Sequence, residues 1–147
     1  MFKIISVFFS ASIVLFLAVL MIVYAFMPES AGILFNDKGD RIQEISRDTF
    51  FYATLIGFVL FQLLFYLFIV NVLNKKFNTS KKINMSIWFK GMFLAINFFF
   101  ILMLIFIGLA NNAIDYTFTS IEYISFLGPG LIVVWLLIFP IFYFKSK

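Results

Sequence analysis

The chain has 147 residues, of which 64% are hydrophobic, 22% aromatic and only 12% charged. Soluble domains carry about 25% charged residues, so this composition excludes a soluble monomeric globule. The sequence has no cysteine and no histidine, which excludes disulfides, thiolate or imidazole metal sites, and Ser-His or Cys-His catalytic pairs.

Four apolar stretches follow one another along the chain, at residues 4–27, 49–73, 91–110 and 127–144. A helix needs about 20 apolar residues to cross the hydrocarbon layer of a membrane, and each stretch has close to this length. The sequence therefore predicts an all-α membrane protein in which residues 1–147 form a single four-helix domain. Its expected connections are outer loops at residues 28–48 and 111–126 and an inner loop at residues 74–90.

The first stretch has two interpretations, a retained helix or a cleaved signal peptide. Val23, Tyr24 and Ala25 resemble a cleavage sequence. The apolar run is nevertheless longer than the apolar part of a signal peptide, which has about 7–15 residues. We therefore expect the first helix to be retained.

The charged residues divide between the two ends of this arrangement. One end combines the N-terminus, the inner loop and the C-terminus, and it carries only basic residues: Lys3, Lys75, Lys76, Lys81, Lys82, Lys90, Lys145 and Lys147. The other end carries three basic residues and seven acidic ones: Lys38, Arg41, Arg47, Glu29, Asp37, Asp40, Glu44, Asp48, Asp115 and Glu122. Because cytoplasmic loops collect lysine and arginine, we expect both termini in the cytoplasm. The excess lysines then meet lipid headgroups, and no nucleic-acid partner is expected.

Small and amide side chains within the spans predict how the helices pack. Ala11, Ala18 and Ala25 recur every seven residues, and small residues let helices approach closely in lipid. This stripe suits packing within the chain or, alternatively, a partner protein. Gln62 and Asn97 lie near the middle of consecutive antiparallel spans, where their amides can pair. Three glycines offer a similar close approach: Gly57, Gly91 and Gly108.

No charged residue lies in the middle of any predicted span. Proton relays, ion-coupled pumps and voltage sensors depend on such groups, so a small transporter or channel is disfavoured. The chain also lacks the internal repeat that is typical of transporters. We predict no catalytic residue, no cofactor site and no metal site, and hence no enzyme.

The first outer loop contains a turn at residues 36–39, where asparagine and aspartate precede Gly39. Apolar residues flank this turn, so a short hairpin is expected. Calcium binding through Asn36, Asp37 and Asp40 is an alternative, although the spacing does not match a twelve-residue calcium loop with its closing glutamate. Ser46 or Asp48 is expected to cap the second helix.

The same loop resembles the uncharacterised membrane domain at the N-terminus of the SdpI-type immunity proteins. The matching positions are Pro28, Phe35, Asn36, Gly39, Ser46 and Arg47. Leu34 stands where the pattern has histidine, and Ile42 stands where aspartate is common. The resemblance covers about residues 12–70. It implies a small polytopic membrane protein of the bacterial envelope in stress, signalling or toxin immunity, without a catalytic residue.

Two functions are consistent with these patterns. The first is a non-enzymatic SdpI-like membrane protein that recognises a peptide, toxin or signalling partner through its outer loops and helix bundle. The second is a structural or accessory subunit of a larger membrane complex, which would use the small-residue stripe of the first helix. Beyond the bilayer itself, the expected partner is thus a peptide or another membrane protein.

Overall fold

The structure is a computed structural model that describes residues 2–36, 38–77, 79–112 and 121–144. It is mostly helical, and a two-stranded antiparallel sheet lies between the first two helices. In chain order the elements are α1 (Phe2–Phe26), β1 (Ser30–Phe35), β2 (Arg41–Ser46), α2 (Arg47–Lys76), α3 (Thr79–Asn111), α5 (Tyr123–Leu137) and α6 (Phe139–Phe144).

Within the described residues, four helical stretches are long and apolar enough to cross a membrane. They are Ile4–Phe26, Arg47–Lys75, Lys81–Asn111 and Tyr123–Phe144. The prediction of four membrane-length helices is therefore confirmed, and the predicted hairpin is also present. Such a chain is compatible with a polytopic membrane protein.

The connection between the second and third spans differs from the prediction. Residues 74–90 were expected to form an inner loop, but α2 continues to Lys76 and α3 begins at Thr79. Residues 79–90 contain neither proline nor glycine, so nothing in this segment ends a helix. Hydropathy marks only the apolar part of a helix, and α3 extends beyond that part by about three turns.

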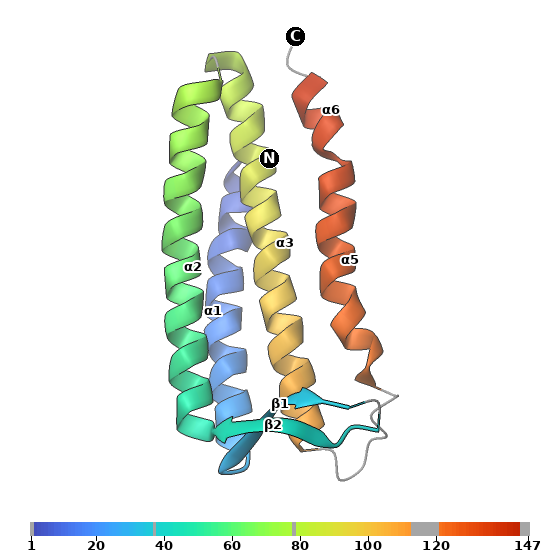
Figure 1. The fold of residues 1–147 in the computed structure, drawn as a ribbon. Helices are drawn as coiled ribbons and strands as arrows, with labels where there is room; N and C mark the ends of the chain where they lie inside the picture. Colours follow the sequence, from blue (N-terminus) through green and yellow to red (C-terminus); the bar gives the residue numbers. More distant parts are fainter. Residues whose placement is uncertain (1, 37, 78, 113–120, 145–147) are drawn as a thin grey trace.

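The helices run side by side and alternate in direction (Figure 1). The sheet lies at the end where α1 stops and α2 starts. The opposite end holds the first residues of α1, the turn from α2 to α3, and α6. Helix α3 is central, since it makes extensive contacts with α1 on one side and with α5 on the other. Both ends of the described chain thus lie at the end opposite the sheet.

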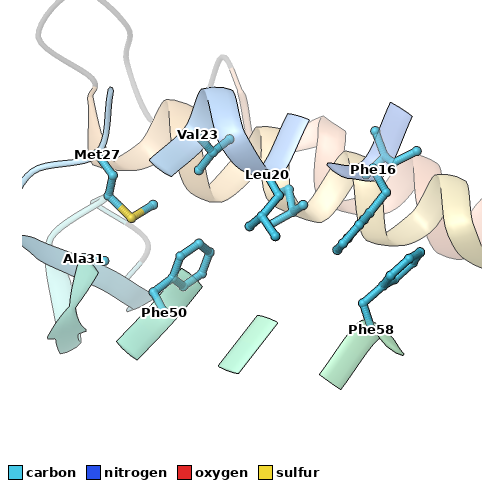
Figure 2. Close-up of a cluster of buried hydrophobic side chains, with 9 residues drawn as sticks. Phe16, Leu20, Val23, Met27, Ala31, Phe50 and Phe58 are labelled. Carbon is cyan, nitrogen blue, oxygen red and sulfur yellow. The ribbon is translucent and has the colours of Figure 1, made fainter. Parts of the chain in front are cut away.

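The main buried cluster lies between α1, α2 and α3 in the half of the bundle nearer the sheet (Figure 2). Phe16 and Phe58 stack with ring centroids 3.6 Å apart and an interplanar angle of 10°. Leu20 is 1% exposed and Ala31 of β1 is fully buried, so the cluster continues from the helices to the sheet. Lipid is as apolar as these side chains, and their close packing is therefore what holds the helices together.

Helix α5 approaches α3 at two glycines. A methyl group on Gly91 would overlap the indole ring of Trp135, and one on Gly128 would lie 3.1 Å from the Cα of Phe99. The two indoles also bond across this interface. Trp135 Nε1 donates to the Trp88 carbonyl at 3.0 Å, and Trp88 Nε1 donates to the Trp135 carbonyl at 3.4 Å. The surfaces of α3 and α5 therefore pack closely against each other at this contact.

The other two glycines that were predicted to pack, Gly57 and Gly108, have different surroundings. A methyl group on Gly108 would lie 2.9 Å from a methyl carbon of Val23, so this glycine is at the contact of α3 with α1. Gly57 has no neighbouring atom within 4 Å of such a methyl group. The packing interpretation therefore suits Gly91 and Gly108, but it is wrong for Gly57.

Candidate functional site: the hairpin and a polar chain within the bundle

The turn of the hairpin has the predicted chemistry. The side-chain oxygen of Asn36 accepts hydrogen bonds from the backbone N–H groups of Lys38 and Asp40, at 2.9 and 2.8 Å. Gly39 has a φ of 86°, a conformation that side chains disfavour. The side chains of Asn36 and Asp40 bond each other at 2.9 Å, and Asp37, the third residue of the calcium hypothesis, lies outside the described residues. Asn36 and Gly39 thus define the turn.

An amide at the end of α3 holds β1 in place. Asn111 is 7% exposed, and it acts on Gly32 as a neighbouring strand would. Its Oδ1 accepts from the Gly32 N–H at 2.7 Å, and its Nδ2 donates to the Gly32 carbonyl at 2.9 Å. Arg41 of β2 adds a bond to the Asn111 carbonyl at 3.1 Å. The hairpin is therefore fastened to the helix bundle rather than tethered by its two ends alone.

The second attachment lies where β2 passes into α2. Ser46 caps α2, since its Oγ accepts from the Thr49 N–H at 3.2 Å, as predicted. Arg47 N donates to the Glu29 carbonyl at 2.9 Å, and its guanidinium lies 5.0 Å from the centre of the Tyr24 ring. Tyr24 in turn donates to Asp48 at 2.8 Å. A polar cleft of about 250 Å³ lies between Glu29, Ser46, Arg47 and Asp48.

Each of the six residues of the loop pattern has a structural role in the hairpin. Asn36, Gly39, Ser46 and Arg47 form the turn, the helix cap and the attachment described above. Phe35 packs edge-on against Phe106 of α3 with centroids 6.3 Å apart, and Pro28 lies half-buried between α1 and β1. These six residues are all used to shape and seat the hairpin.

The outer edge of the hairpin is β2. Every β2 residue except Ile45 is exposed. Within the part of the chain that the structure describes, β2 pairs with one strand, β1, and its other edge is open. Two apolar side chains project from the hairpin, Leu34 with 53% and Ile42 with 67% of its surface exposed. The hairpin therefore combines an open strand edge with exposed apolar side chains.

A chain of polar side chains crosses the middle of the bundle. Gln62 of α2 donates from Nε2 to Asn97 Oδ1 at 2.6 Å, so the two amides that the sequence suggested could pair are in contact. Asn97 is fully buried, and its Nδ2 donates to Ser12 of α1 at 2.9 Å. Ser12 then donates to the carbonyl of Phe9 at 2.7 Å. The bonds tie three helices together at one level.

Next to this chain is a cavity of about 410 Å³ between α1, α2 and α3. Apolar side chains line most of it, with Gln62 at one end and Lys90 of α3 at the other. Lys90 Nζ donates to Ser6 of α1 at 3.1 Å. The Oε1 atom of Gln62 is buried and has no hydrogen-bond partner among the described residues. The cavity therefore has a polar end inside the bundle and a cationic end towards α6 and the start of α1.

The alanine stripe of α1 is not part of any of these contacts. Ala11, Ala18 and Ala25 are all exposed. The side of α1 that faces α2 and α3 carries Ser12, Phe16 and larger residues instead. The interpretation of this stripe as packing within the chain is therefore wrong, and the stripe lies on the outer surface of the bundle.

Taken together, these features define a bundle of four membrane-length helices with a firmly attached hairpin at one end. No family model, curated protein or solved structure matches the chain. The functional conclusions therefore depend on the geometry described above.

Proposed function

We propose that the chain is a non-enzymatic, SdpI-like protein of the bacterial inner membrane that recognises a peptide partner with its outer hairpin. The observation that carries this proposal is the open edge of β2 on a hairpin that is fastened to the bundle. An extended peptide can add to such an edge as a further strand, with backbone hydrogen bonds for affinity and side-chain pockets for specificity.

The attachment of the hairpin matters for the strength of this recognition. Binding to a mobile loop costs about 0.5–1.5 kcal/mol for each side chain that must be ordered. Asn111 and Arg47 have already fixed the hairpin in this chain. A peptide that adds to β2 therefore meets a prepared strand, and the exposed Ile42 offers it an apolar contact.

The orientation in the membrane is part of the same proposal. Among the described residues, Lys75, Lys81 and Lys82 gather at the α2–α3 turn, whereas Glu44 and Asp48 lie at the hairpin end. The preference of lysine and arginine for the cytoplasm places both termini inside and the hairpin outside. A reporter fused at Lys82 is expected to signal from the cytoplasm, and a signal from outside would contradict this orientation.

The decisive experiment compares cells with and without the gene for sensitivity to envelope-acting peptides. Deletion is expected to raise sensitivity, and the wild-type gene is expected to restore protection. Ile42→Asp is expected to abolish this protection, whereas Ile83→Asp, which alters an exposed residue at the opposite end, is expected to retain it. Equal sensitivity with and without the gene, or full protection by Ile42→Asp, would refute the proposal.

A specific observation also favours the second candidate, an accessory subunit of a larger membrane complex. The exposed stripe of Ala11, Ala18 and Ala25 offers a partner helix a close approach on the outer surface of α1. Extraction at native expression levels is then expected to yield a complex that Ala18→Phe disrupts. Recovery of the lone 17 kDa chain would remove this candidate.

A further inference from the structure

The cavity between α1, α2 and α3 lies at a definite depth in the bundle. Lys90 precedes Asn111 on α3 by 21 residues, which corresponds to about 32 Å along a helix. The hydrocarbon layer is about 30 Å thick. With Asn111 and the hairpin at one surface of the membrane, Lys90 lies at the level of the lipid headgroups of the other.

From this level the cavity runs into the hydrocarbon region. Asn97 follows Lys90 by seven residues, so the polar chain lies about 10 Å deeper. The walls of the cavity are apolar side chains of all three helices: Phe9, Ile13, Ile69, Val70, Leu73 and Phe93. A narrow apolar space that begins at the headgroup level suits a hydrocarbon chain that enters from the bilayer.

The groups at the cationic end suit an anion. Lys90 is accompanied there by the hydroxyl groups of Ser6 and Ser86, both of which line the cavity. An ammonium group and hydroxyl groups are donors for the oxygens of a phosphate group. The acidic residues that the structure describes all lie at or near the hairpin end, far from this group. Charge therefore favours an anionic ligand over a zwitterionic or cationic one.

We propose that this cavity is a binding site for an anionic phospholipid of the leaflet opposite the hairpin. The phosphate group accepts hydrogen bonds from Lys90 and the neighbouring hydroxyl groups, and one acyl chain enters between α1 and α2. The acyl chain stops short of Gln62, whose polar atoms close the far end. This site lies at the opposite side of the membrane from the hairpin, and it does not depend on the peptide recognition proposed above.

The test is a lipid titration of the purified protein in detergent, followed by native mass spectrometry. Phosphatidylglycerol is expected to bind at one saturable site, more tightly than phosphatidylcholine of the same chain length. A basic residue near a membrane surface contributes about 1 kcal/mol to the attraction of anionic lipid, which is about five-fold in affinity. Lys90→Gln is therefore expected to weaken phosphatidylglycerol binding at least five-fold.

Two matched controls separate a built site from general attraction. Lys82→Gln removes the same charge at the same end of the bundle but outside the cavity lining, and it is expected to leave the affinity unchanged. Val70→Phe fills the cavity and is expected to prevent binding, whereas Leu67→Phe adds the same ring type on an exposed part of α2 and is expected to be neutral. Circular dichroism shows whether each variant is folded.

Three results would overturn the proposal. One is an equal loss of affinity in Lys82→Gln and Lys90→Gln, which would mean attraction by the surface alone. Another is undiminished binding by a folded Val70→Phe protein. The third is displacement of bound phosphatidylglycerol by millimolar inorganic phosphate as effectively as by added phosphatidylglycerol. The acyl chain would then contribute nothing to binding.

Discussion

The contact between α3 and α5 allows a sharp test of the packing described above, through Gly91→Ala. The added methyl group would overlap the indole ring of Trp135, and this ring cannot move aside without breaking its bonded pair with Trp88. We expect the variant to separate α5 from α3 or to force a shift of Trp135. In either case the four-helix bundle becomes less stable.

The magnitude follows from three contributions. An extra methyl group in a well-packed contact costs about 1–3 kcal/mol. Loss of the two hydrogen bonds between Trp88 and Trp135 costs about 0.6 kcal/mol each, the average for such bonds in membranes. Alanine is better than glycine in a helix by about 1 kcal/mol, which offsets part of the loss. The net decrease in the free energy of unfolding is about 1–3 kcal/mol.

Unfolding in mixed micelles with increasing sodium dodecyl sulfate measures this change. The chain has two tryptophans, and both lie at this interface, so their fluorescence reports directly on the α3–α5 contact. Gly57→Ala is the matched control, because its added methyl group has no neighbour within 4 Å. It is expected to leave stability unchanged or to raise it by up to about 1 kcal/mol. Equal shifts of the unfolding midpoint in Gly91→Ala and Gly57→Ala would refute the reasoning.

Three further variants test two polar contacts and the turn of the hairpin. Asn97→Leu is expected to lower the free energy of unfolding by about 1–3 kcal/mol, because Gln62 and Ser12 lose a buried partner. The same detergent titration measures this change, and an unchanged unfolding midpoint would contradict it. Asn111→Leu is expected to release the hairpin from α3, so that hydrogen exchange becomes faster at β1 while the helices stay protected. Unchanged exchange at β1 would mean that the Asn111 amide does not hold the hairpin. Gly39→Ala is expected to destabilise the turn by about 1 kcal/mol, because Gly39 has a φ of 86°. Faster hydrogen exchange is then expected in the hairpin alone. Exchange like that of the wild type would show that the turn tolerates a side chain.

Local chemistry made several elements predictable from the sequence. The spans follow from length and hydropathy, which the membrane itself dictates. The turn follows from Asn36 and Gly39, whose roles depend only on their own backbone. The pairing of Gln62 with Asn97 was accessible because an amide within a membrane needs a partner and consecutive helices are antiparallel. In each case the information lies within one element or between two neighbours.

The remaining features depend on information that no local pattern contains. The seven-residue spacing of Ala11, Ala18 and Ala25 identifies one face of a helix, but both the lipid-facing and the buried faces are apolar in a membrane protein. Hydrophobicity therefore could not show that this face points outward. Asn111 bonds Gly32 from 79 positions away, and an asparagine at the end of a span looks the same in sequence whether it meets water or a strand. Only the folded hairpin makes it an attachment.

Helix α3 divides the bundle into two parts that are held in different ways. Its α5 side is a close contact, in which Gly91 accommodates the indole ring of Trp135. Its α2 side is held by Phe100 packed against Phe58 and Phe61, by the Gln62–Asn97 hydrogen bond and by Phe93 packed against Phe65, and the cavity lies beside these contacts. Beyond Gln62, α2 still contacts α3 through Phe65, whose ring centroid lies 4.5 Å from that of Phe93 at the wall of the cavity. A ligand that fills the cavity lies against Phe93 of α3 and against Ile69, Val70 and Leu73 of α2, so its binding is expected to be coupled to the position of α2.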